Sequence, residues 1–336
     1  MVGHRQSLYP LTFTPVLRDY IWGGRNLERL YGRCLPPGPN AESWEISGHP
    51  TASTVVDSGP LRGKPLPEVL ESYGLDLSGT RARWALERSK FPLMIKLLDV
   101  ETRLSVQVHP PDEYAMAHED GELGKTEMWY VLHARPGAHL IMGLRPGITL
   151  ATFRQAVADE RLEECLNYVP AKAGDTFLIS PGTVHAALEG LVIAEVLQNS
   201  DTTYRVCDWG RTGTDGQPRP LHIGKAMEVI NFHQDPPGPI APMLAGTHEG
   251  LARYELTRCQ YFVVERVSLE SGAAYAGYTE GETFEIWGTI DGQAQLSWAD
   301  GSISLPTIRF CLVPACLGGF SIGSNGPTTM LRAYLP

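Results

Sequence analysis

The chain has 336 residues, of which 43% are hydrophobic, and its formal net charge is −10. This length predicts two domains or one large domain, with enough apolar residues to bury a full core. The acidic charge argues against non-specific nucleic-acid binding, and the sequence has no apolar run of about 18 residues that would predict a membrane span.

Most of the chain is predicted to form short strands separated by turns. Alternating or continuous apolar runs are typical of strands with one or both faces buried. In the first two thirds of the chain such runs lie at 92–100, 103–109, 126–134, 138–144, 175–180 and 191–197. The 35 glycines and 26 prolines supply the turns. This density of strands predicts a sandwich or a barrel.

Helical patterns are local and short. Between residues 149 and 166 apolar residues recur near the helical period, and Thr149 precedes them as a candidate N-cap. Two shorter helices are predicted at 65–74 and 222–232. Helices of this length indicate connections within a mainly β protein.

The segment 232–246, FHQDPPGPIAPMLAG, is rich in proline and glycine and is predicted to be a linker. It separates a first region, 1–231, from a second region, 247–336. Strands are predicted in the second region at 261–269, 283–290, 294–298 and 308–313. The sequence has no histidine after His248. We therefore expect the second region to be a structural or interfacial β-domain without a metal.

A distinctive polar pair lies in LSVQVHPP, residues 104–111. Apolar and polar residues alternate there, so Gln107 and His109 point to the same face of a predicted strand. Pro110 and Pro111 then end the strand. The strand therefore presents an amide and an imidazole side by side and turns away beyond them.

Two further side chains suit the same site. Glu127 begins a predicted strand, and His185 follows a Pro-Gly turn. With Gln107 and His109 they supply two imidazoles, a carboxylate and an amide oxygen, which Zn²⁺ accepts in near-tetrahedral geometry. Taken singly, each has a simpler interpretation, since a lone histidine usually forms only hydrogen bonds and a strand-end carboxylate usually faces water.

The order of these motifs resembles the cupin superfamily, in which paired ligands on one strand precede a glutamate and a final histidine. PGTVH, residues 181–185, matches the second cupin motif in part. More closely, the chain resembles the type I phosphomannose isomerases of the short bacterial kind, from about Tyr20 to about Phe232. The motifs that carry this resemblance are YIWGG, AESWEIS, LSVQVHP, GKTEMWYVL, AGDTFLISPGTVHA and LQNSDTTYRVCDWGR.

The resemblance implies an all-β-dominated cupin, that is, a jelly-roll barrel with a few short helices and a second, degenerate cupin-like β-domain. It also implies one Zn²⁺ per chain. The implied ligands are Gln107, His109, Glu127 and His185. The implied pocket residues are Ser105 near the phosphate, Lys125, Glu195 and the active-site Arg205. Pro111 and Cys207 depart from the family pattern, and we expect them to alter packing at the rim and not metal binding.

The implied reaction interconverts mannose 6-phosphate and fructose 6-phosphate through an enediolate. Glu195 is the first candidate for the proton-transferring base, while a ligand histidine and a zinc-bound water remain alternatives. Lys125 or Arg205 is expected to stabilise the developing charge. Lys125, Arg205 and Arg211 would form a local positive patch for the sugar phosphate, with Ser105 as a hydroxyl donor.

Three other functions fit the same pattern. An Fe²⁺ cupin dioxygenase is disfavoured because such sites usually have a histidine where this chain has Gln107. A non-catalytic sugar-binding or regulatory cupin would not need Lys125, Glu195 and Arg205. An isomerase of free mannose remains open. The six cysteines lack a CxxC pair and the N-terminus lacks a signal-peptide pattern, so we expect a cytoplasmic monomer or weak homodimer without nucleic-acid or membrane partners.

Overall fold

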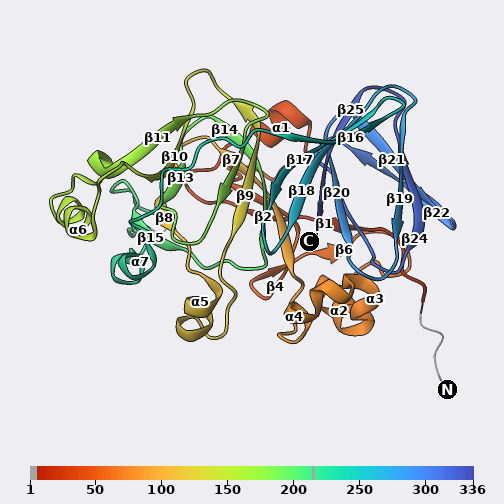
Figure 1. Ribbon diagram of the computed structural model, residues 1–336, viewed down its shortest axis with the longest axis horizontal. Helices are drawn as coiled ribbons and strands as arrows, with labels where there is room; N and C mark the ends of the chain where they lie inside the picture. Colours follow the sequence, from red (N-terminus) through yellow and green to blue (C-terminus); the bar gives the residue numbers. More distant parts are fainter. Residues whose placement is uncertain (1–5, 214–215) are drawn as a thin grey trace. The chain divides into compact units, whose positions relative to one another are not determined.

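The computed structural model describes residues 6–213 and 216–336 (Figure 1). Strands dominate the described chain, and the helices are short, which confirms the predicted all-β-dominated class. The chain forms two compact units. Unit 2 consists of residues 17–43 and 95–240, apart from the undescribed pair 214–215. Unit 1 consists of the described residues before 17 together with 44–94 and 241–336.

The units are therefore not continuous in sequence. The chain passes from unit 2 to unit 1 between residues 240 and 241, inside the segment predicted to be a linker. A strand, β16, already begins at Met243 within that segment. Residues 44–94, which precede the linker by far, group with the C-terminal part. The predicted domains 1–231 and 247–336 are continuous in sequence, whereas the two compact units are not. The domain division therefore stays a prediction.

Unit 2 is built around two antiparallel sheets. The six-stranded sheet has the order β12 (Thr176–Ile179), β9 (Glu127–Ala134), β14 (Leu191–Gln198), β7 (Leu93–Val100), β3 (Glu42–Ile46) and β2 (Val16–Arg18). The five-stranded sheet has the order β11 (Leu166–Pro170), β10 (His139–Leu144), β13 (His185–Ala187), β8 (Val106–Val108) and β15 (Tyr204–Cys207).

A large apolar cluster of buried residues joins the two sheets of unit 2. It takes Trp129 and Val131 from the six-stranded sheet and Val106, Ile141 and Met142 from the five-stranded sheet, all of them buried. This inward apolar face is what the alternation in the sequence predicts. The predicted strands at 92–100, 126–134, 138–144, 175–180 and 191–197 agree with the observed strands to within one residue at each end. The strand predicted at 103–109 is shorter and covers Val106–Val108, although the N–H of Leu104 still bonds to Ala187 O.

The predicted helices are confirmed in place but are shorter or interrupted. The helix 149–166 consists of α6 (Leu150–Ala158) and a 3-10 turn (Leu162–Cys165), separated by Glu160 with a positive φ of 58°. Thr149 caps α6 by accepting the N–H of Thr152. The other helices are α1 (Asn26–Tyr31), α2 (Leu66–Tyr73), α3 (Leu75–Ser78), α4 (Arg83–Leu86), α5 (Asp112–His118) and α7 (Ile223–Val229), with a 3-10 turn at Thr80–Ala82.

Helix α5 was not expected from the sequence. It begins directly after Pro111, whose backbone is extended with φ −70°, and Asp112 and Glu113 lie in its first turn. Proline is well placed at the start of a helix, and acidic residues there complement the helix dipole. Pro111, one of the two departures from the family pattern, is therefore compatible with the chain's course after the strand.

Unit 1 also contains two packed sheets. The eight-stranded sheet has the order β16 (Met243–His248), β17 (Leu251–Arg258), β18 (Val263–Leu269), β25 (Thr328–Tyr334), β20 (Glu285–Asp291), β23 (Phe310–Val313), β1 (Leu11–Thr14) and β6 (Val55–Val56). The four-stranded sheet has the order β19 (Ala274–Thr279), β24 (Gly318–Gly323), β21 (Gln293–Trp298) and β22 (Gly301–Pro306). A small pair, β4 (Gly48–His49) and β5 (Ala52–Ser53), completes the strands. Within the described residues, no helix has the length and apolar character that a membrane span requires.

Candidate metal centre and active-site cleft

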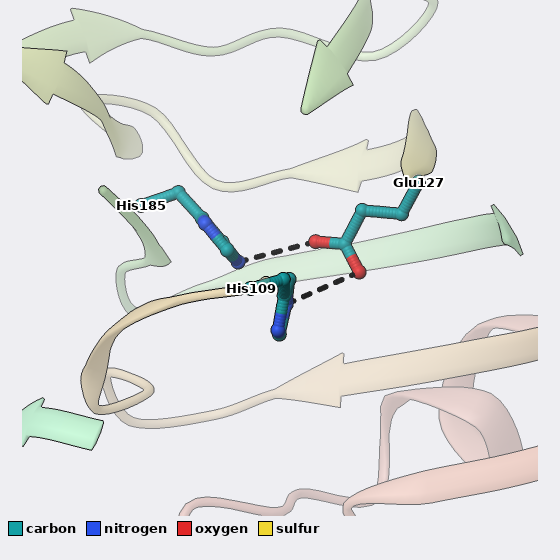
Figure 2. A group of neighbouring side chains, drawn as sticks. All are labelled: His109, Glu127 and His185. Atoms are coloured by element: carbon teal, nitrogen blue, oxygen red, sulfur yellow. Dashed lines mark ion pairs between the residues drawn. The ribbon is translucent and has the colours of Figure 1, made fainter. Parts of the chain in front are cut away.

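Three buried ionisable side chains meet in unit 2 (Figure 2). One ligand atom from each of His109, Glu127 and His185 lies within 4.8 Å of the other two. Nε2 of His185 is 3.1 Å from Glu127 Oε1, and Nε2 of His109 is 3.6 Å from Glu127 Oε2. Each side chain is 0% exposed. Two imidazoles thus point at the two oxygens of one carboxylate.

Strand pairing brings the fourth predicted ligand into place. His185 of β13 is the cross-strand partner of Gln107 of β8, and Gln107 is in turn the partner of Arg205 of β15. Side chains of directly paired residues lie on the same face of a sheet. His185, Gln107 and Arg205 therefore form a row across three neighbouring strands.

The turn before His185 requires a glycine. Gly182 has φ 84°, and a Cβ there would lie 2.8 Å from the carbonyl oxygen of Val229. Residues with side chains rarely adopt this conformation, and the close approach excludes them further. The Pro-Gly pair therefore has a specific role. Gly182 allows the backbone to turn, and this turn places His185 at the start of β13.

Backbone carbonyls orient both imidazoles. Nδ1 of His109 bonds to Thr202 O at 2.8 Å, and Nδ1 of His185 bonds to Thr183 O at 2.9 Å. Each ring therefore donates through Nδ1 and directs Nε2 at the centre, as in histidines that bind metal ions. Burial and the neighbouring Lys125 lower the pKa of His109 to about 3, so that this ring is neutral near pH 7. A neutral imidazole is the form that coordinates a cation.

The polar atoms of the centre are better suited to binding a cation than to hydrogen bonding with one another. Nε2 of His109 and both oxygens of Glu127 are buried and accept or donate no hydrogen bond of good geometry within the described chain. Leaving such atoms unpaired costs several kcal/mol in an apolar interior. Gln107 Nε2 lies 3.2 Å from His185 Nε2, and a half-turn of the amide would place its oxygen there instead. The residues present therefore match the implied metal site.

A cleft of ≈ 250 Å³ opens beside this centre within unit 2. The predicted residues that line it are Ser105, Gln107, Lys125, Glu195 and Arg205. His109, Glu127 and His185 are not among its lining residues. Apart from Arg211, the structure thus brings the predicted site residues together and arranges them as a buried centre with an adjoining cleft.

Glu195 is held in the cleft wall. Its Oε1 accepts the indole N–H of Trp129 at 2.9 Å, and the side chain is buried. Burial and the nearby charge of Glu127 raise the pKa of Glu195 to about 8. Lys125 is also buried, and its Nζ lies 3.0 Å from Glu127 Oε2. Although burial opposes it, the charge of Lys125 holds the pKa of Glu127 well below its usual range.

Lys96 is a cleft residue that the sequence interpretation missed. Its Nζ lies 3.3 Å from Asp201 Oδ1 and 3.5 Å from Glu42 Oε2, and all three residues line the cleft. Although burial opposes it, these carboxylates raise the pKa of Lys96. A signal was present, since PLMIKLLDV places a lysine in the middle of a mostly apolar strand that is buried throughout. A buried lysine is rare unless it is paired.

Arg205 lies at the other end of the row from His185. Its Nη1 donates to Pro220 O at 2.8 Å, while its buried Nε has no partner among the residues described. Burial and the neighbouring Arg219 lower the pKa of Arg205. Arg219 also lines the cleft and was not predicted. Arg211 does not line it and donates instead to Asp208 and to the carbonyl of Arg103, so the cleft holds a different second arginine from the one expected.

The second departure from the family pattern, Cys207, lies near this end of the cleft. It is the last residue of β15 and is partly exposed, and its Sγ accepts the N–H of Trp209 at 3.4 Å. The Trp209 indole N–H bonds to Leu104 O, and Arg103 stacks on its ring. Cys207 is thus part of the packing around the strand end and contributes no atom to the histidine–glutamate cluster.

Comparison with known proteins identifies the family of this chain. Residues 11–135 match the family model of the type I phosphomannose isomerase catalytic domain. The mannose-6-phosphate isomerase ManA of Bacillus subtilis (strain 168) is 35% identical over 317 residues, which is 93% of this chain and 95% of that protein. The mannose-6-phosphate isomerase of Streptococcus mutans is 41% identical over 223 residues, which is 66% of this chain and 68% of that protein.

Solved structures agree as well. The crystal structure of the mannose 6-phosphate isomerase from Bacillus subtilis superposes with a TM-score of 0.86 at 31% identity, covering 97% of this chain and 99% of that chain. A variant of the phosphomannose isomerase from Salmonella typhimurium shares the fold with a TM-score of 0.75 at 17% identity. The predicted cupin fold is confirmed, and the chain belongs to the type I phosphomannose isomerase family.

Proposed function

We propose that this chain is a zinc-dependent aldose–ketose isomerase that interconverts mannose 6-phosphate and fructose 6-phosphate through an enediolate. The observation that carries the proposal is the buried set of His109, Glu127 and His185 beside a cleft lined by Gln107 and cationic side chains. Gln107, His109, Glu127 and His185 would hold the metal. When bound there, Zn²⁺ supplies a Lewis acid for the oxygens on C1 and C2 of the sugar.

Glu195 is the proton-transferring base in this proposal. Both imidazoles already use Nδ1 for a backbone carbonyl and direct Nε2 at the centre, so neither ring has a nitrogen left to carry a proton. The cleft carboxylates Glu42 and Asp201 lie beside Lys96. Glu195 is fixed by Trp129 and faces the same cleft. It takes the proton from C2 of the aldose and returns it to C1, while a proton moves from O2 to O1.

Lys125 and Arg205 stabilise the negative charge that develops on the sugar oxygens. Lys125 is buried next to Glu127, and Arg205 is the cross-strand partner of Gln107. Donors fixed in advance near a developing charge lower the barrier more than mobile ones, because they need not reorganise during the reaction. Ser105 lines the same cleft and supplies a hydroxyl donor for the sugar phosphate.

A coupled assay of fructose 6-phosphate formation from mannose 6-phosphate tests the proposal, with metal analysis of the purified protein alongside. We expect turnover and one zinc per chain. A protein that binds the sugar phosphate without turnover would be the sugar-binding cupin, and equal kcat/KM for free mannose would indicate an isomerase of the unphosphorylated sugar. Iron in place of zinc would favour dioxygenase chemistry.

A further inference from the structure

His222 contacts Arg205 at the edge of a sheet, and the proposed mechanism gives it no role. β15 is the outermost strand of the five-stranded sheet, and Arg205 pairs with Gln107 of β8 on the inner side. On the outer side the backbone N–H of His222 donates to Arg205 O at 2.8 Å. Nδ1 of the His222 ring accepts the backbone N–H of Arg205 at 3.2 Å. His222 therefore covers the open edge of the sheet at the position of Arg205.

The imidazole takes the place of a carbonyl group in this pairing. In an antiparallel ladder, two residues that form a hydrogen-bonded pair donate to each other's carbonyl oxygens. The carbonyl of His222 is already occupied, because it accepts the N–H of Ala226 at the start of α7. The ring nitrogen supplies the second acceptor instead. Without an acceptor on this side chain, the N–H of Arg205 would lose its partner at a partly buried position, which carries a free-energy cost.

The His222 ring is in the form that accepts this hydrogen bond. Burial and the charges of Arg205 and Lys225 lower the pKa of His222, so the ring is neutral near pH 7. The carboxylate of Glu119 acts in the opposite direction, but it is bound to Lys225 at 2.6 Å. Because the backbone N–H of Arg205 donates to Nδ1, the ring proton lies on Nε2.

A second contact from the same segment holds the Arg205 side chain. Its Nη1 donates to the carbonyl oxygen of Pro220 at 2.8 Å. Pro218 and Pro220 restrict the backbone before His222, since each proline ring fixes its own φ. Residues 220 and 222 thus contact Arg205 at its N–H, its carbonyl and its guanidinium. The buried Nε of Arg205 has no partner among the residues described, so it is left for the substrate.

We propose that His222 is a positioning residue, which fixes Arg205 on β15 so that the guanidinium faces the cleft before the substrate binds. This inference rests on the proposed function, because it concerns the arginine that the reaction uses. A donor fixed in advance stabilises a developing charge without reorganising, and a displacement of about 1 Å can cost about 100-fold in rate. His222 is not among the described residues that line the cleft, so it acts through Arg205.

The kinetic test compares two replacements of the imidazole. His222→Leu removes the acceptor and should lower kcat/KM for mannose 6-phosphate by about 10- to 100-fold with zinc content unchanged. The His222 side chain makes no capping hydrogen bond to α7, so this change leaves the helix its contacts. In His222→Asn the amide oxygen lies the same number of bonds from the backbone as Nδ1. This variant should stay within about threefold of the wild type.

Three outcomes would overturn the inference. They are wild-type kinetics in His222→Leu, a loss in His222→Asn as large as in His222→Leu, and a change in a different kinetic constant from the one that Arg205→Lys alters. If the leucine variant folds poorly, His222→Gln replaces it, because its amide oxygen lies one bond further out and should not restore activity.

A double variant and a matched control test whether the effect passes through Arg205. In the Arg205→Lys background, His222→Leu should lower kcat/KM by no more than about threefold further, and a product of the two single losses would contradict the inference. The control is His139→Leu. His139 lies on β10 of the same sheet, and its Nδ1 is 2.7 Å from Gly137 O, away from the cleft. An equal loss in this control would also overturn the inference.

Amide hydrogen exchange separates this inference from the proposed function. In NMR spectra of the intact protein, the Arg205 amide should exchange at least about 10-fold faster in His222→Leu than in the wild type or in His222→Asn. Equal exchange in the wild type and His222→Leu would overturn the inference whether or not the protein is an isomerase. A wild type with this protected amide and bound zinc but no turnover would refute the reaction and leave the contact standing.

Discussion

Trp129 donates its indole N–H to Oε1 of Glu195 at 2.9 Å, across the directly paired positions of β9 and β14. The same ring packs edge-on against His185, with ring centroids 5.4 Å apart. One buried side chain therefore contacts both the proposed base and a proposed metal ligand. This contact makes the orientation of Glu195 dependent on Trp129.

Trp129→Phe should lower kcat because it keeps most of the ring and removes the hydrogen bond to Glu195. Leaving a buried polar group without its hydrogen-bond partner costs ~1–3 kcal/mol, so kcat is expected to fall about 5- to 100-fold with zinc content unchanged. Steady-state kinetics and metal analysis check this. Trp287→Phe is the control, since Trp287 donates in the same way to Glu285 in unit 1, and it should leave kcat unaltered. Equal kcat values for Trp129→Phe and wild type would remove this positioning role.

Replacing either imidazole should remove the metal and the activity together. His109→Ala and His185→Ala each delete a ligand from a centre whose atoms lie within 4.8 Å of one another. We expect less than about one tenth of the zinc of the wild type, which should hold one zinc per chain. The control is His118→Ala, because His118 is exposed and its Nδ1 contacts Tyr114 O. This variant should keep the zinc content of the wild type. Full zinc in either ligand variant, or a second zinc in the wild type, would contradict the assignment.

Arg205→Lys should retain the fold and the zinc but lower kcat/KM for mannose 6-phosphate by about 100-fold or more, as for loss of a transition-state donor. A lysine cannot reproduce the planar fork that donates to Pro220 O and faces the cleft. If Arg205 only binds the phosphate of the ground state, KM rises and kcat stays. Kinetics like those of the wild type would exclude Arg205 from the site.

Lys96→Met should destabilise the protein. It removes the buried ammonium that lies 3.5 Å from Glu42 and 3.3 Å from Asp201, whose side chains are 15% and 37% exposed. Breaking a fully buried pair by removing one partner costs about 3–5 kcal/mol, and the exposure of the two carboxylates reduces this cost to about 1–3 kcal/mol. Lys64→Met is the matched control, because Lys64 pairs with Glu68 at an exposed surface and its loss should change stability little. Urea denaturation measures the free energy of unfolding of both variants. A similar decrease in the two would show that the ion pairs of Lys96 contribute little to stability.

Local sequence patterns determined the elements of the site. Alternation in residues 104–109 placed Gln107 and His109 on one face, and the pairing of Gln107 with His185 and Arg205 agrees with that face. The long apolar runs predicted β7, β9 and β14 to within a residue, because a strand buried on both faces needs continuous apolar side chains. The order of the motifs also predicted the family.

Only the tertiary structure decided which charges meet. Lys96 pairs with Glu42 and Asp201, which lie 54 and 105 residues away in the chain. Asp208 forms ion pairs with Arg219 and with Arg211. Pairing of Leu11 with Leu312 likewise joins β1 to β23 across most of the chain. Periodicity specifies which face of an element is buried, whereas the partner across that face depends on packing among elements that are distant in sequence.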